Sequence, residues 1–299
     1  MMTKQEFRNY LSGGIHFLDG ATGSNLMLSG MPKGCCAEKW ILEHPQPLLA
    51  LQQGYAQAGS DIIYAPTFQA NPIALEKEGL ADKTEEINAR LIALSRQAAP
   101  DCLIAGDLAT LATHCDSWNP DNFEHLVAAY QRQIRGLIDG GADLLVGETL
   151  LYPQEAEAIV TAAELEGAGA VMISFTMQSD GSLFSGADAG KVLHELEGSG
   201  VDALGFNCVV ADMMTPHLVS KLRRYTSLPL ICKPNAGNPV IGSDGVAHYD
   251  LSKEGFSDIM KQCAQNGALL LGGCCGTNPE FIAAMKQAVM AVQPCTYQL

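Results

Sequence analysis

The sequence predicts one α/β domain with the architecture of a (β/α)8 TIM barrel, and three observations lead to this prediction. Eight short apolar runs follow one another along the 299 residues, and most neighbouring runs are separated by a segment with helical spacing. No low-complexity linker or block of charge divides the chain. Eight such units in a chain of this length favour a closed barrel over an open doubly wound sheet. We therefore expect residues 1–299 to form a single domain.

The expected strands are short apolar stretches rich in β-branched residues. They lie at residues 14–19, 60–68, 102–108, 142–149, 170–176, 201–208, 228–235 and 267–275. The clearest helical segments have apolar residues three and four positions apart, and they lie at residues 47–59, 85–99, 123–141 and 153–167. Alternating strands and helices indicate right-handed βαβ units and a parallel sheet.

Two long loops interrupt this alternation. One spans residues 20–40 after the first strand, and the other spans residues 109–123 after the third strand. Both leave the carboxyl ends of their strands, which is the side of a barrel where active sites lie.

Composition excludes several classes of function. The chain has 18 Lys and Arg against 33 Asp and Glu, a net charge of -15, so it repels polyanions and is not expected to bind nucleic acid. The amino terminus lacks the pattern of a secretory signal, and no stretch approaches the roughly 18 apolar residues of a membrane span. We expect a cytoplasmic protein whose ten cysteines stay reduced.

The residues at the carboxyl ends of the eight strands converge on one rim of a barrel. They are Asp19, Gly20, Thr67, Phe68, Gln69, Asp107, Glu148, Thr149, Asn207, Cys208, Asn235, Cys274 and Cys275. The set brings together three carboxylates and three thiols, so the rim is where chemistry is expected.

Three cysteines on this rim suit a zinc ion. Cys208, Cys274 and Cys275 supply three corners of a tetrahedral site and leave the fourth corner open, which is the catalytic arrangement. Zinc held by three thiolates is a poor Lewis acid but a good host for another thiolate, which it keeps ionised near neutral pH. The alternative is that three ordinary small residues fall at strand ends.

Two further cysteine groups are weaker candidates. Cys35 and Cys36 form a second adjacent pair, but they lie well past the first strand beside charged residues. Cys115 follows His114 in the second long loop. We expect neither group to hold the metal.

Two rim carboxylates and a glycine-containing loop suggest an amino-acid ligand. Asp19 and Glu148 can hold an ammonium group, and the backbone amides of residues 21–25 can receive a carboxylate. The alternative for both carboxylates is an ordinary salt bridge at the rim. The loop does not match a phosphate-binding motif.

Six motifs now resemble, in kind and in order, those of the homocysteine S-methyltransferase family. They are LDGATGSNL, APTFQAN, GGADLLVGET, GFNC, KPNAG and GGCCGT. The resemblance runs from about residue 15 to about residue 292, and it is closest to the homocysteine-binding barrel of cobalamin-dependent methionine synthase.

The resemblance implies a role for each matched residue. Cys208, Cys274 and Cys275 would bind Zn²⁺, and Asp19 and Glu148 would take the amino group of homocysteine. The amides around Thr22 and Gly23 would hold its carboxylate, while its sulfur would enter the open zinc corner and attack a methyl group. Asn235 is a candidate for that corner in the absence of substrate, or else it caps the turn after the seventh strand.

Departures from the family narrow the methyl donor. Phe68 is followed by Gln69, and Thr149 stands where the betaine-dependent type has a tyrosine, so a cage for betaine is not expected. The sequence ends at Leu299 without the further domains of methionine synthase, so the donor is expected in trans, either a methylated corrinoid protein or a small molecule such as S-methylmethionine.

Two alternatives to homocysteine methylation remain open at this stage. One is a methyltransferase that uses the same zinc site for another thiol or selenol. The other is a non-catalytic subunit that docks a corrinoid protein and stores zinc. The apparently complete set of amino-acid-binding residues speaks against the second.

Overall fold

The computed structural model describes residues 1–112, 122–178, 180–242 and 247–291. Its centre is an eight-stranded parallel sheet with the order β1-β10-β7-β6-β5-β4-β3-β2. The strands are β1 (His16–Phe17), β2 (Ile62–Tyr64), β3 (Leu103–Ala109), β4 (Leu144–Leu150), β5 (Val171–Phe175), β6 (Ala203–Val210), β7 (Leu230–Asn235) and β10 (Ala268–Leu271). A parallel bridge between Leu18 and Ile62 joins the two edges, so the sheet closes as a barrel.

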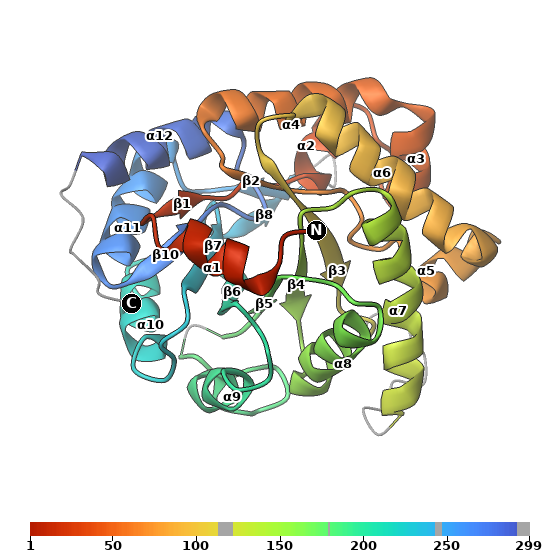
Figure 1. Cartoon of the computed structure of the whole chain (residues 1–299). Helices are drawn as coiled ribbons and strands as arrows, with labels where there is room; N and C mark the ends of the chain where they lie inside the picture. Colours follow the sequence, from red (N-terminus) through yellow and green to blue (C-terminus); the bar gives the residue numbers. More distant parts are fainter. Residues whose placement is uncertain (113–121, 179, 243–246, 292–299) are drawn as a thin grey trace.

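Helices surround the strands (Figure 1). They are α1 (Lys4–Leu11), α2 (Gly23–Leu28), α3 (Ala37–Glu43), α4 (Pro45–Ala58), α5 (Pro72–Glu76), the 3-10 helix η1 (Ala81–Lys83), α6 (Thr84–Ala98), α7 (Phe123–Asp139), α8 (Pro153–Leu165), α9 (Ala189–Leu196), α10 (Thr215–Leu222), α11 (Lys253–Gln265) and α12 (Pro279–Met290). The (β/α)8 architecture expected from the sequence is therefore confirmed.

Alternate residues of each strand face opposite sides of the barrel wall, because side chains in a strand point up and down in turn. On β4, Leu144 and Val146 lie in the inner apolar cluster, whereas Leu145 packs in the larger cluster that includes the helices. The next residue of the inner series is Glu148. The barrel interior is thus apolar at its amino end and polar at its carboxyl end, and we call these ends the floor and the mouth.

Helix α1 covers the floor. Its buried side chains Phe7 and Leu11 belong to the inner cluster, together with residues from the strands. A capping box between Thr3 and Glu6 fixes where the helix begins. Figure 1 looks onto this end, with α1 in red across the foreground. The interior is therefore closed on the side opposite the mouth.

Three aspartates connect neighbouring strands at the floor, and we call them the floor aspartates. Each directly precedes a strand and accepts a hydrogen bond from a backbone amide of the preceding barrel strand: Asp61 from Phe17 (2.7 Å), Asp143 from Ile104 (2.7 Å) and Asp202 from Val171 (3.1 Å). Each also has its own cation: Lys286 at 4.0 Å from Asp61, Arg96 beside Asp143, and Arg8 at 3.1 Å from Asp202. Such pairing satisfies amides at the ends of strands.

Some segments differ from the sequence-based expectation. The first expected long loop contains α2 and α3, and a short antiparallel hairpin of β8 (Pro239–Ile241) and β9 (Ala247–Tyr249) follows β7. Most of the second expected loop, including His114 and Cys115, lies outside the described residues. None of the described helices has the length and apolar composition needed to cross a bilayer.

Candidate active site at the barrel mouth

Three cysteines that are far apart in the sequence meet at the mouth. The ligand atoms of Cys208, Cys274 and Cys275 all lie within 4.8 Å of one another, and the Cys208 and Cys275 sulfurs are 3.9 Å apart. All three are free thiols. Four ligands at 2.3 Å in a tetrahedron stand about 3.8 Å from one another, so the spacing fits zinc or a similar thiophilic ion. They form the one such ligand cluster found among the described residues.

The loop that carries two of these cysteines is held on both sides. The Gly273 amide donates to the Asp19 carbonyl (3.0 Å), and the Cys274 amide donates to the Pro234 carbonyl (2.7 Å). The Thr277 hydroxyl closes the turn by donating to the Cys274 carbonyl at 2.7 Å. Gly276 has a φ of +82°, and a Cβ atom there would lie 2.3 Å from the ring of Tyr249. The loop can therefore direct the sulfurs of Cys274 and Cys275 toward the same point at the mouth.

The three thiols interact strongly with one another. Hydrogen bonds from the other two sulfurs lower the pKa of Cys275 to about 3, and a hydrogen bond from the Tyr249 side chain acts in the same direction. The same sulfur contacts raise the pKa of Cys208. The sulfur contacts thus favour the thiolate form at Cys275, which is the form that binds metal.

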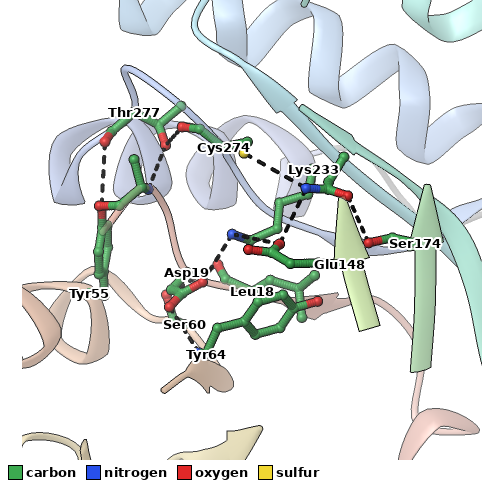
Figure 2. A network of polar contacts seen from close by, with 12 residues as sticks. Leu18, Asp19, Tyr55, Ser60, Tyr64, Glu148, Ser174, Lys233, Cys274 and Thr277 are labelled. Atoms are coloured by element: carbon green, nitrogen blue, oxygen red, sulfur yellow. Dashed lines mark hydrogen bonds and ion pairs between the residues drawn. The ribbon is translucent and has the colours of Figure 1, made fainter. Parts of the chain in front are cut away.

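A buried lysine lies among the mouth carboxylates (Figure 2). The Lys233 ammonium is 3.4 Å from Asp19 Oδ1, 3.9 Å from Glu148 Oε2 and 4.6 Å from the centre of the Tyr64 ring. The other oxygen of Asp19 accepts the Tyr64 amide at 2.9 Å. Burial alone would lower the pKa of Lys233, but Glu148 and Asp19 together raise it. The lysine therefore stays charged.

A third carboxyl group, Asp107, completes the set. Burial raises the pKa of Asp107, and the neighbouring Glu148 raises it further. The hydrogen bond between the two side chains lowers the pKa of Glu148, although burial raises it more. The two groups thus share a proton, as expected when two carboxyl groups stand close together. Three mouth carboxyls, Asp19, Asp107 and Glu148, share one ammonium group, that of Lys233.

Asn207 connects the carboxylates to the cysteines. This fully buried side chain donates to Glu148 (3.3 Å) and to the Thr149 hydroxyl (2.6 Å), and it accepts the Thr149 amide (2.8 Å) and the Ser174 hydroxyl (2.9 Å). Its amide nitrogen also lies 3.9 Å from the Cys274 sulfur. Figure 2 shows Glu148, Ser174 and Cys274 close to Lys233.

The backbone is strained next to this asparagine. Thr149 and Cys208 both have φ = 57°, and among the described residues they are the two non-glycine residues with positive φ. L-residues rarely adopt this conformation, and such strain clusters at functional sites. Both residues follow directly on a site residue, Glu148 or Asn207, so the strain lies where the strands end and the mouth begins.

The loop predicted to bind a carboxylate lies beside the cysteine loop. Thr22 is half-buried and Gly23 is exposed at the start of α2. The Ala21 amide donates to the Thr277 hydroxyl (3.2 Å), and the Gly276 amide donates to the Ser24 hydroxyl (3.4 Å). The two loops are thus joined, and their amides lie on the same side of the mouth.

Asn235 bridges strand β6, which carries Cys208, and the loop after β10, which carries Cys275. Its amide nitrogen donates to the Cys208 carbonyl (3.2 Å), and its carbonyl oxygen accepts the Cys275 amide (3.1 Å). The side chain is therefore adjacent to the sulfur cluster, and in this structure it orders the backbone of two candidate ligands.

The remaining described cysteines lie elsewhere. Cys36 is 3.6 Å from the buried Glu38, and Cys35 is exposed. Cys102, Cys232 and Cys263 are buried in the core, as expected for small apolar side chains.

Sequence reasoning missed two residues of the site. Lys233 was included in an apolar strand, although a lysine within such a run is itself a signal of a buried partner. Asn207 was placed on the rim without a role, and nothing local in the sequence announces its four hydrogen bonds. Taken together, the mouth can hold a thiophilic metal, place a thiol beside it and bind a charged end group.

Comparisons with known proteins agree with this geometry. The chain matches the family model described as "Homocysteine S-methyltransferase" over residues 16–289. It is 27% identical over 290 residues to "Methionine synthase" of Mycobacterium leprae, covering 91% of this chain and 24% of that protein. The methionine synthase of Mycobacterium tuberculosis is also 27% identical, over 293 residues. The chain spans about a quarter of the length of these curated relatives.

A solved structure covers nearly the same length. The metallated form of the homocysteine methyltransferase MmuM from Escherichia coli has a TM-score of 0.78 and 26% sequence identity, covering 92% of this chain and 96% of that one. Its oxidized form has a TM-score of 0.77 at the same identity. The likeness therefore extends over the whole barrel.

Proposed function

The chain belongs to the homocysteine S-methyltransferase family, and from this premise we propose that it is a zinc-dependent enzyme that methylates the thiol of homocysteine to give methionine. The observation that carries the proposal is the cluster of Cys208, Cys274 and Cys275, whose sulfurs lie within 4.8 Å of one another. A metallated form of a homocysteine methyltransferase with the same fold supports the metal. Under this proposal, residues 1–299 are the homocysteine-binding methyltransferase barrel.

The three cysteines would hold Zn²⁺. When bound, the ion lowers the pKa of an incoming thiol so that its sulfur is ionised and still nucleophilic. The chain's own residues prepare this site: the cysteine loop is fixed to β1 and β7, and Asn207 fixes the strand end that carries Cys208. A cluster that is already ordered loses little entropy when it takes up the ion.

The rest of the pocket would bind the amino-acid end of homocysteine. Asp19 and Glu148 face the interior within reach of a cationic group, since both already lie within 4.0 Å of the Lys233 ammonium. The amides around Thr22 and Gly23 would receive the carboxylate. Binding at two points aligns the thiol with the sulfur cluster, and alignment of reacting groups accounts for a large part of a displacement rate.

Asn235 has two candidate roles. It would occupy the fourth corner of the metal site when homocysteine is absent, or it would act only through the backbone of Cys208 and Cys275, which it already contacts. Zinc absorption-edge spectra of the substrate-free protein and an Asn235→Ala variant would separate the two, because loss of an oxygen ligand changes the coordination shell.

The methyl donor would come from outside the barrel. The resemblance of the motifs to cobalamin-dependent methionine synthase favours a methylated corrinoid protein, and a small methyl donor is the alternative. The mouth is the open end of the barrel, so either donor would approach from there.

One experiment tests the proposal directly. Purified protein is loaded with zinc and incubated with homocysteine and a panel of donors that includes methylcobalamin, a methylated corrinoid protein and S-methylmethionine. We expect about one zinc per chain and methionine with at least one donor. Stoichiometric zinc without methionine from any donor would contradict the proposed activity while leaving the metal site intact.

A further inference from the structure

The pocket proposed to bind the substrate ammonium already contains an ammonium of its own. Lys233 extends from β7 into the barrel, and only 4% of its side chain is exposed. Its Nζ atom lies between Asp19 and Glu148, at 3.4 Å and 3.9 Å from their nearest oxygens. An acceptor ammonium bound to the same two carboxylates would therefore lie close to a like charge.

The net charge of the pocket determines how strongly a second cation can bind. Burial raises the pKa of both Asp107 and Glu148, which are hydrogen-bonded to each other, so this pair carries less than its full negative charge. One ammonium already compensates part of that charge. Asp19 Oδ1 is buried, and its contact with a cation is the 3.4 Å ion pair with Lys233, so an acceptor ammonium bound there would share this oxygen with the lysine. Its attraction to the pocket is reduced, because repulsion from Lys233 opposes it.

The surroundings of the Lys233 ammonium hold it in the pocket. The ring of Tyr64 lies 4.6 Å from the ammonium and both neighbouring carboxylates are buried. Moving the charge into the apolar interior below would cost far more than it gains. The lysine charge therefore stays in the pocket and affects which acceptors bind there.

We propose that Lys233 is a specificity-determining residue, which reduces the pocket's demand for an α-ammonium and admits thiols that carry a carboxylate alone. The inference rests on the function proposed above and widens its acceptor class from homocysteine to ω-sulfanyl carboxylates with or without an amino group. The representative without one is 4-sulfanylbutanoate, which is homocysteine lacking its amino group.

The test is a calorimetric titration of the zinc-loaded full chain with L-homocysteine and with 4-sulfanylbutanoate. In the unmodified protein we expect the two dissociation constants to lie within about tenfold of each other. In Lys233→Met the preference for homocysteine should rise by at least about tenfold, because the like charge is gone.

Lys286→Met is the matched control. Lys286 also lies near a carboxylate and an aromatic ring, 4.0 Å from Asp61 and 5.0 Å from the centre of the Phe17 ring, but it belongs to the floor. It changes the net charge of the chain by the same amount, so its binding preference should equal that of the unmodified protein. Lys233→Gln keeps a polar head in the pocket and replaces Lys233→Met if that variant does not fold.

The possible outcomes separate this inference from the function on which it rests. Binding of homocysteine with a preference above about a hundredfold in the unmodified protein, or with a preference that Lys233→Met and Lys233→Gln leave unchanged, would overturn the role of Lys233 alone. Binding of neither thiol to the zinc-loaded protein would overturn the proposed function and this inference with it.

Discussion

The two ends of the barrel use carboxylates in opposite ways. At the floor, each of Asp61, Asp143 and Asp202 has its own backbone amide and its own cation. At the mouth, three buried carboxyl groups share Lys233, and two of their oxygens have no hydrogen-bond partner. Floor carboxylates are satisfied within the fold, whereas mouth carboxylates have capacity left over. That unused capacity is what distinguishes a binding site from a structural device.

The largest effect is expected where the mouth holds its sulfurs. Replacing Cys275 by Ala removes one of three ligands, so bound zinc should fall to well below one per chain and homocysteine methylation should drop by on the order of a thousandfold or more. Metal analysis and a methionine assay measure both. Cys35→Ala, at an exposed site, should retain full zinc and activity. Full zinc in Cys275→Ala would remove this residue from the ligand set.

A pH experiment tests how burial acts on one mouth carboxylate. Burial raises the pKa of Asp19 from 3.8 to about 6, although Lys233 opposes the shift. The folded state then binds more protons than the unfolded state between these values, so stability is lost as pH rises from about 4 to about 6. About two pKa units correspond to about 3 kcal/mol.

Asp19→Asn should lack this loss. We expect the unfolding free energy of the variant, relative to the unmodified protein, to increase by about 3 kcal/mol between pH 4 and pH 7. Urea unfolding of both metal-free proteins at several pH values measures the difference. A difference that does not change with pH would show that burial does not raise the pKa of Asp19.

At the floor, substitution should affect stability without affecting chemistry. Asp202→Ala leaves the Val171 amide without its 3.1 Å acceptor and Arg8 without its partner. We expect the unfolding free energy to fall by about 2 kcal/mol. Zinc content and the KM for homocysteine, measured under conditions where the variant is folded, should not change. A raised KM would mean that the two ends of the barrel are coupled.

A mouth carboxylate should show the reverse pattern. Glu148→Gln preserves the size of the side chain and an acceptor for Asn207, which lies 3.3 Å away. We expect the KM for homocysteine to rise about tenfold through loss of charge, with zinc content unchanged. Steady-state kinetics together with metal analysis tests both statements, and an unaltered KM would place Glu148 outside the acceptor pocket.

The smallest effect is expected for the most exposed floor pair. Lys286 and Asp61 are 4.0 Å apart, with 34% and 32% of their side chains exposed. Lys286→Met should change the unfolding free energy by less than about 1 kcal/mol, because exposed ion pairs contribute little. A loss as large as that expected for Asp202→Ala would mean that burial does not decide how much a floor pair contributes.

Local patterns predicted the barrel well. All eight strands and the four clearest helices lie within a few residues of the expected ranges, because apolar periodicity reports directly on which residues face a core. The meeting of three distant cysteines also followed from the sequence, since the carboxyl ends of parallel strands must share one rim. Features that depend only on a residue's position in its own strand were therefore predictable.

Contacts between side chains of different strands across the barrel could not be predicted from the sequence. The position of Lys233 between Asp19 and Glu148 depends on β7, β1 and β4 together, and no short motif encodes that combination. The helices α2 and α3 fall in a range that the sequence predicts to be loop, because their six and seven residues are too short for a clear period. Helix α1 was missed for the same reason, although its buried Phe7 and Leu11 close the floor.

The sealed floor has a kinetic consequence. With α1 across one end, molecules reach the sulfur cluster by the mouth alone, and a donor seated there covers whatever lies deeper. Under the proposed function, the acceptor would then enter first and its methylated product would leave last, which is a compulsory order of addition and release. Product-inhibition patterns would reveal that order, because methionine would compete with homocysteine and not with the donor.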